Sequence, residues 1–94
     1  MKQPTVYILA NKKNGTLYTG VTSDLVQRVY QHKQLKVSGF SKRYNCTKLV
    51  YYQHYETMIE AISAEKKLKG GSRKHKIFLI ENSNVDWLDL YEFF

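Results

Sequence analysis

The sequence predicts an α+β domain in which a three-stranded, mostly antiparallel sheet is flanked by helices in the order β-β-α-β-α-α. Two observations predict the sheet: an Asn-Gly pair separates two short runs rich in β-branched and aromatic residues, and a third such run follows near mid-chain. A third observation predicts the helices, because three stretches combine helical periodicity with N-capping residues. With 94 residues, the chain is expected to form one domain over residues 1–94.

The first expected element is a hairpin formed by residues 5–10 and 16–21. Both runs are rich in the residue types that favour strands. Between them, Asn14-Gly15 is a strong hairpin signal, because a type I′ turn needs a positive φ at both central positions. The sequence therefore predicts a two-residue turn made of Asn14 and Gly15.

That turn fixes how the two strands pair. It places Asn11 opposite Tyr18, and the alternation of side chains then puts Tyr7 and Tyr18 on the same face of the sheet. In this register the two tyrosines stand four residues apart along the strand, about 13 Å. The opposite face is the expected core face, with Val6, Ile8, Ala10, Leu17 and Val21.

A helix is expected after Asp24, where Gln27 completes a variant of the capping box. Arg28 and His32 are four residues apart and are expected to stack at the border of the helix's apolar stripe. That stripe is predicted to contain Leu25, Val26, Val29 and Tyr30. An exposed basic loop over residues 35–45 and a third strand over residues 47–55 follow.

Two further helices are expected after the third strand. Thr57 and Glu60 form a capping box, and the helix that they open ends at Gly70-Gly71. Ser72 caps the next helix, which extends to about Glu81. The predicted apolar side chains are Met58, Ala61, Ile62 and Leu68 in the first helix, Ile77, Phe78 and Ile80 in the second, and Trp87, Leu88 and Leu90 in the tail.

Glu65 lies inside the apolar stripe of its helix. A carboxylate there is costly unless it is paired with a cation or binds a metal. The residues alone leave three interpretations open: a metal-binding or catalytic carboxylate, a buried salt bridge (for instance with Arg28), or a side chain that turns out to solvent. Arg28 and His32 form either a second part of a site or an exposed basic patch.

The charge distribution points to a polyanionic partner. The chain has 15 Lys and Arg against 8 Asp and Glu, and residues 1–80 hold all the basic residues but only four acids, a formal net charge of +11. Such a surface favours nucleic acid, although a lysine-rich helix face can also be merely solvated. The candidate nucleic-acid-binding residues are Lys36, Lys42, Arg43, Lys66, Lys67, Lys69, Arg73, Lys74 and Lys76.

Several other classes are excluded by the sequence. No apolar run approaches the roughly 20 residues that a membrane span needs, and the first residues lead into no signal-peptide pattern, so a cytoplasmic protein without a membrane partner is expected. Cys46 is the sole cysteine, and its spacing from the three histidines fits no zinc finger.

Several of these residues resemble the signature of the GIY-YIG nucleases. Thr5-Val6-Tyr7 and Tyr18-Thr19-Gly20, with eleven residues from tyrosine to tyrosine, resemble the paired motif, and Arg28-x-x-x-His32 and Glu65 follow in the family's order. Residues 64–70 and 79–82 resemble later segments of its small stand-alone bacterial members, which are related to the N-terminal nuclease module of the excinuclease C subunit. The likeness covers roughly residues 5–90.

The resemblance implies a metal-dependent DNA endonuclease with one divalent ion, Mg²⁺ or Mn²⁺, held by Glu65. It implies that Tyr7 is the general base, directly or through His32, that Tyr18 contacts the phosphate or the water, and that Arg28 binds the phosphate. The family's late asparagine corresponds to Asn82 or Asn84, and we choose Asn82.

The partners that the resemblance implies are DNA and a larger repair or recombination complex. The alternative function is a non-catalytic nucleic-acid-binding module in DNA repair or processing. A third possibility is a small basic protein in which the signature residues are only structural.

Overall fold

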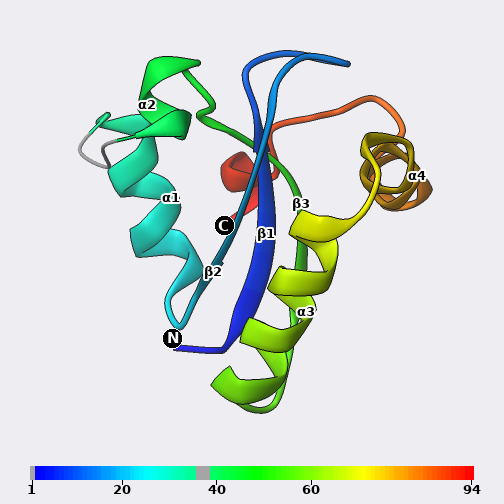
Figure 1. Cartoon of the computed structure of the whole chain (residues 1–94). Coiled ribbons are helices and arrows are strands. Elements are labelled where there is room, and N and C mark those ends of the chain that lie inside the picture. The colour runs from blue at the N-terminus through cyan, green and yellow to red at the C-terminus, as the bar shows by residue number, and fades with distance from the viewer. Residues whose placement is uncertain (1, 36–38) are drawn as a thin grey trace.

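The computed structural model describes residues 2–35 and 39–94, and it confirms the predicted α+β class (Figure 1). One short helix, α2, interrupts the segment that was expected to be a loop. Within the described ranges, no helix has the length and apolar character that a membrane span requires. The elements are β1 (Thr5–Ala10), β2 (Leu17–Thr22), α1 (Leu25–Lys33), α2 (Phe40–Arg43), β3 (Lys48–His54), α3 (Met58–Gly70), α4 (Arg73–Ser83) and a 3₁₀ turn (Leu90–Phe93).

The sheet has the order β2-β1-β3, and both pairings are antiparallel, as predicted. Helices α1 and α3 lie on opposite sides of it (Figure 1). All six residues of the central strand β1 are therefore buried. The expectation of a single core face was wrong, because α1 covers the face that carries Tyr7 as fully as α3 covers the other.

The core consists of one apolar cluster on each face of the sheet. Towards α3 and α4 lie Val6, Ile8, Ala10, Val50, Ala61, Leu68, Ile80 and Trp87. Towards α1 lie Tyr7, Leu9, Leu25, Val29, Cys46 and Leu49. The second cluster is the one that holds a predicted site residue, Tyr7.

The hairpin has a wider turn than the sequence predicted. The N–H of Gly15 donates to the carbonyl of Lys12 (2.9 Å), and Asn14 alone takes a positive φ, of 58°. The side chain of Asn11 accepts the N–H of Thr16 (2.9 Å) and so closes the loop.

This wider turn shifts the strand register. Tyr18 lies opposite Leu9 rather than Asn11, and Gly20 lies opposite Tyr7. A shift of two residues keeps every side chain on its predicted face, but it brings Tyr18 closer to Tyr7 than the predicted pairing did.

The face that α1 buries also differs from the prediction. Asp24 caps the helix through the N–H of Gln27, as expected. Val26 and Tyr30, however, are 43% and 45% exposed. The buried residues are Leu25, Val29 and His32. The inward stripe is thus narrower than predicted and passes through His32.

In α3 the capping box of Thr57 and Glu60 is present as predicted. Its buried residues are Ala61, Glu65 and Leu68. Ile62, which we expected in the stripe, is exposed, and so are Phe78 in α4 and Leu88 in the tail. Trp87 packs as predicted: it is fully buried, and its indole N–H donates to Glu81 (2.8 Å).

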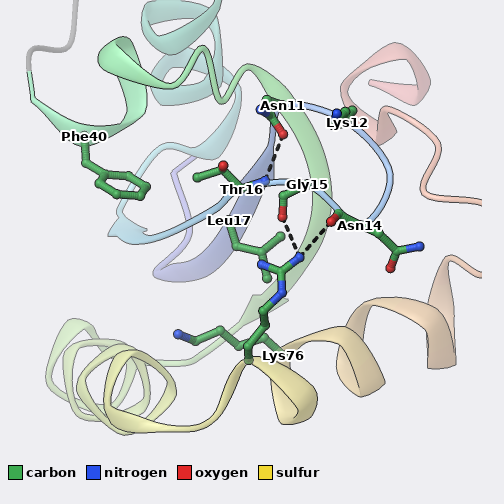
Figure 2. A pocket seen from close by; sticks show the side chains of 9 residues that line it. Asn11, Lys12, Asn14, Gly15, Thr16, Leu17, Phe40 and Lys76 are labelled. Atoms are coloured by element: carbon green, nitrogen blue, oxygen red, sulfur yellow. Dashed lines mark hydrogen bonds between the residues drawn. The ribbon is translucent and has the colours of Figure 1, made fainter.

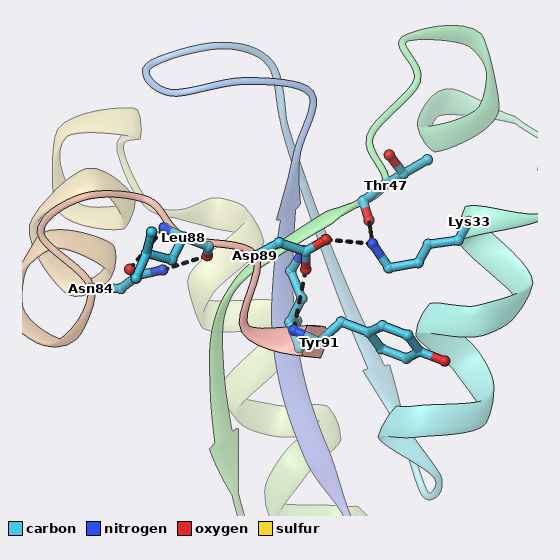
Figure 3. Close-up of polar contacts among 7 residues, drawn as sticks. Lys33, Thr47, Asn84, Leu88, Asp89 and Tyr91 are labelled. Carbon is cyan, nitrogen blue, oxygen red and sulfur yellow. Dashed lines mark hydrogen bonds and ion pairs between the residues drawn. The ribbon is translucent and has the colours of Figure 1, made fainter. Parts of the chain in front are cut away.

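An ion pair ties the end of the chain to α1. The ammonium of Lys33 contacts a carboxylate oxygen of Asp89 (2.5 Å) and also donates to the carbonyl of Thr47 (Figure 3). The other oxygen of Asp89 accepts the backbone N–H groups of Leu49 and Tyr91. Asp89 therefore joins α1, β3 and the terminal 3₁₀ turn.

Candidate active site

Tyr7 lies at the centre of the candidate site, on the central strand. Its side chain is almost fully buried, at 1% exposure, and it packs over Gly20 on the neighbouring strand. A Cβ atom at position 20 would lie 2.5 Å from both Cζ and Oη of Tyr7. The glycine of the Tyr18-Thr19-Gly20 motif therefore leaves the space that the phenol of Tyr7 occupies.

The hydroxyl of Tyr7 is hydrogen-bonded to His32 of α1. Its oxygen lies 3.0 Å from Nε2 of the ring, and Nδ1 lies 2.9 Å from Oγ of Ser41 in α2. All three side chains are buried. The site thus contains a continuous chain of polar groups that runs from β1 through α1 to α2.

Tyr18 completes an aromatic group with Tyr7 and His32. Its ring centroid lies 6.3 Å from that of Tyr7 and 5.2 Å from that of His32. The observed hairpin register makes this possible, since Tyr18 is paired with Leu9, only two residues from Tyr7. Unlike Tyr7, Tyr18 is partly exposed and can be reached by a ligand.

Arg28 and Glu65 approach this group from opposite sides of the sheet. Arg28 in α1 is half-buried and donates to Gln31 (3.3 Å), and its nearby positive charge lowers the pKa of Tyr7 against the effect of burial. Glu65 in α3 is 8% exposed and pairs with Lys69 (2.8 Å). The salt-bridge partner that we considered for Glu65 was Arg28; the observed partner is Lys69.

The site keeps both Tyr7 and His32 neutral at pH 7. Burial, with a smaller effect of Tyr18, raises the pKa of Tyr7 to about 12, although Arg28 acts in the opposite direction. Burial, followed by the charge of Arg28, lowers the pKa of His32 to about 4. The phenol therefore holds its proton, and the imidazole can accept one.

Among the predicted site residues, Glu65 is the one that offers carboxylate oxygens to a hard cation such as Mg²⁺. Among residues 2–35 and 39–94, no group of three or more His, Cys, Asp or Glu side chains could hold a metal. A single buried carboxylate is still a suitable oxygen ligand for a divalent ion that takes its other ligands from water and a phosphate. The present contact of Glu65 is the ammonium of Lys69, for which such an ion would substitute.

Comparison with known proteins identifies the family of the chain. Residues 3–78 match the family model described as the GIY-YIG catalytic domain. The chain belongs to the GIY-YIG family. That family's domain is a nuclease fold, which indicates a nuclease-type function, DNA as the substrate and the use of divalent metal ions.

The similar proteins are small members of this GIY-YIG family. A UPF0213 protein of Staphylococcus saprophyticus is 32% identical over 80 residues, which cover 85% of this chain and 96% of the relative. A UPF0213 protein of Pediococcus acidilactici is 36% identical over 72 residues, 74% of each chain. The solution NMR structure of a UPF0213 protein from Bacillus halodurans superposes with a TM-score of 0.53 at 30% identity, covering 86% of this chain and 85% of that one.

The basic residues of this GIY-YIG chain fall into distinct groups. Arg73 donates to the carbonyls of Asn14 and Gly15 (2.8 and 2.7 Å), so its guanidinium anchors the hairpin loop (Figure 2). Lys69 is engaged by Glu65, which raises its pKa. Lys36 lies outside the described residues. Among the other predicted contacts, five are exposed: Lys42, Arg43, Lys66, Lys67 and Lys74.

Lys76 is the remaining predicted cation. It lines an open groove beside the hairpin loop, together with Lys12 and Phe40 (Figure 2). Lys12 was not among the predicted contacts, although its place next to the Asn-Gly pair could have suggested it.

Of the two late asparagines, Asn84 is the one built into the fold. It is buried at the end of α4, where its amide donates to the carbonyl of Val50 (3.1 Å). The same side chain donates to the carbonyl of Leu88 (2.9 Å) and accepts the N–H of Leu88 (2.9 Å) (Figure 3). Asn82 is exposed on the same helix. These contacts give Asn84 a structural role, and the choice of Asn82 as the site residue stays a prediction.

Ser41 is the residue in contact with the site that the sequence did not reveal. It lies in a segment that we expected to be an exposed loop, and the short helix α2 buries it against His32. A lone serine among lysines and aromatic residues gives no periodic signal.

Proposed function

We propose that this chain is a metal-dependent DNA endonuclease that hydrolyses phosphodiester bonds, with residues 1–94 forming one nuclease domain. The observation that carries the proposal is the buried hydrogen bond between Tyr7 and His32, beside Arg28 and Glu65. A domain that only bound DNA would need its surface cations but not a buried phenol–imidazole pair. The pathway that we propose, DNA repair or recombination in the cytoplasm, follows from the resemblance to the excinuclease C module.

In this proposal each side chain has one task. The guanidinium of Arg28 binds the scissile phosphate and stabilises the charge that develops on it. Tyr18, which is partly exposed, hydrogen-bonds the phosphate or the attacking water. Glu65 holds one divalent ion, Mg²⁺ or Mn²⁺, which when bound supplies positive charge next to the phosphate.

Tyr7 is the general base. With a pKa of about 12 it is protonated at rest, so it must release its own proton as it takes one from water. The adjacent Nε2 of His32, 3.0 Å away, is the acceptor that the structure offers. The water oxygen then bonds to phosphorus, the bond to the leaving oxygen breaks, and that oxygen takes a proton from solvent.

The test is cleavage of supercoiled plasmid with Mg²⁺, with Mn²⁺ or with EDTA. The parent protein should nick the plasmid only when a divalent ion is present. Glu65→Gln should lower the single-turnover rate by on the order of a hundredfold or more, because it removes the charged metal ligand. Plasmid binding in a gel-shift assay should be retained, since Glu65 contacts no phosphate in this proposal.

The matched control is Glu56→Gln, which neutralises an exposed carboxylate before α3. It should cleave at the parental rate. A Glu65→Gln protein that is as active as this control would refute the metal assignment. A parent that retards plasmid without cutting it in any divalent ion would support the non-catalytic binding module instead.

A further inference from the structure

We propose that Ser41 is a positioning residue of the candidate active site, which accepts the Nδ1–H of His32 and so directs the lone pair of Nε2 at the hydroxyl of Tyr7. The proposal rests on the function proposed above for the Tyr7–His32 pair, and it adds a third member to that pair.

The placement of Ser41 is unusual for its helix. It is 3% exposed, whereas the preceding residue, Phe40, is 48% exposed and the two that follow, Lys42 and Arg43, are exposed as well. Its Oγ lies 2.9 Å from Nδ1 of His32, and its carbonyl accepts the N–H of Cys46 (2.8 Å), which fixes the backbone. The hydroxyl is therefore held against the ring from within the fold.

A neutral imidazole carries one N–H and one lone pair, so its two neighbours cannot both receive the same kind of hydrogen bond. Burial favours this neutral form of His32. Either Nδ1–H donates to Ser41 and Nε2 accepts from Tyr7, or the two bonds are reversed. Ser41 and Tyr7 are both hydroxyls that can donate or accept, so a further neighbour must select the arrangement.

Arg28 provides that selection. The positive charge of its guanidinium lies near enough to Tyr7 to lower the pKa of that hydroxyl against the effect of burial. A positive charge attracts the lone pairs of the Tyr7 oxygen and repels its hydrogen, so the hydrogen is directed at Nε2 of His32, 3.0 Å away. We therefore assign the ring proton to Nδ1, where the acceptor is Ser41.

This arrangement gives the proton transfer a direction. When Tyr7 takes a proton from water, its own proton passes to Nε2, and His32 becomes an imidazolium whose Nδ1–H remains bonded to Ser41. Without the serine hydroxyl, the ring can turn over or carry its proton on Nε2, and the lone pair no longer faces the phenol. The expected loss is about tenfold in cleavage rate, the lower end of what orienting partners of a histidine contribute.

The experiment uses Ser41→Ala, Ser41→Thr and the control Ser63→Ala, a serine exposed on α3. The first readout is the tautomer of His32, from the ¹⁵N resonances of its ring in protein without DNA or metal. The parent, Ser41→Thr and Ser63→Ala should show a proton on Nδ1, and Ser41→Ala should lose this single tautomer. The second readout is the single-turnover rate, with Ser41→Ala about tenfold slower and Ser41→Thr close to the parent.

A parent whose His32 is protonated on Nε2 would overturn the proposal. The same holds for a Ser41→Ala protein that keeps both the parental tautomer and the parental rate. Because the first readout needs no turnover, an inactive parent would refute the proposed function without deciding the role of Ser41. Thermal melts of all variants confirm that the comparison is made between folded proteins.

Discussion

Replacing Gly20 with alanine tests the packing that positions Tyr7. The new Cβ would lie 2.5 Å from Cζ and Oη of the phenol and 3.0 Å from Cε1. Ordinary carbon contacts begin near 3.5 Å, so the ring must move by about 1 Å. Tyr7 cannot move freely, because its hydroxyl is held by His32 and its ring is buried in the cluster beneath α1.

The expected cost has two parts. Overpacking a well-packed core costs about 1–3 kcal/mol, and loss of the Tyr7–His32 hydrogen bond adds about 1 kcal/mol. A total near 2–4 kcal/mol should lower the melting temperature by on the order of 10–20 °C for a domain of this size. Cleavage should fall by at least tenfold at temperatures where the variant is still folded, since Tyr7, the proposed base, is displaced.

The assay combines urea unfolding with single-turnover cleavage, and Gly70→Ala is the matched control. A Cβ at Gly70 meets nothing within 4 Å, so that variant should be as stable as the parent or slightly more so. In a Tyr7→Leu background the atoms that clash are absent, and Gly20→Ala should then cost less than about 1 kcal/mol. An equal cost of Gly20→Ala in both backgrounds would refute the packing argument.

Three further predictions concern single groups. Tyr7→Phe should slow cleavage by on the order of a hundredfold with only a small loss of stability, as measured by single-turnover kinetics and thermal melts. A Tyr7→Phe protein that cleaves at the parental rate would show that Tyr7 only packs against the sheet. Asn84→Ala should cost about 2–4 kcal/mol in urea unfolding, because it strands the buried carbonyl of Val50, whereas Asn82→Ala should change stability by less than about 0.5 kcal/mol. The pKa of His32 is lowered to about 4 in the folded protein, so the unfolded chain binds a proton on this ring more readily. Up to about 3 kcal/mol of the free energy of unfolding should therefore be lost as the pH falls from 6.5 to 4. Urea unfolding at pH 4, 5.5 and 7 should show this loss, and it should be absent in His32→Gln.

Local signals in the sequence were sufficient to predict the elements and the face of the sheet on which Tyr7 and Tyr18 lie. Asp24, Thr57 and Ser72 cap the helices that they were expected to cap, because a capping bond spans only three residues. Tyr7 and Tyr18 lie on the same face of the sheet, since strand alternation survives a register shift of two.

Other features depend on contacts between distant segments, which no local pattern encodes. The conformation of the hairpin turn depends on two side chains: Asn11 accepts the N–H of Thr16, and Arg73 of α4 donates to the carbonyl of Asn14. The burial of Ser41 depends on His32, nine residues earlier. Asn82 and Asn84 are only two positions apart in the sequence. Asn84 is the one whose amide bonds the buried carbonyl of Val50, a contact with a distant strand.

The ion pair between Lys33 and Asp89 bears on where this domain can be cut. The match to the GIY-YIG catalytic domain ends at residue 78, yet Asp89 lies beyond it and Lys33 follows directly after His32. Trp87, fully buried among residues of the sheet and α3, also lies outside the matched range. A fragment trimmed to that range would lose the Trp87 side chain from one core cluster and the ion pair that ties the last turn of α1, so we expect that a stably folded fragment of this chain must extend through the terminal 3₁₀ turn.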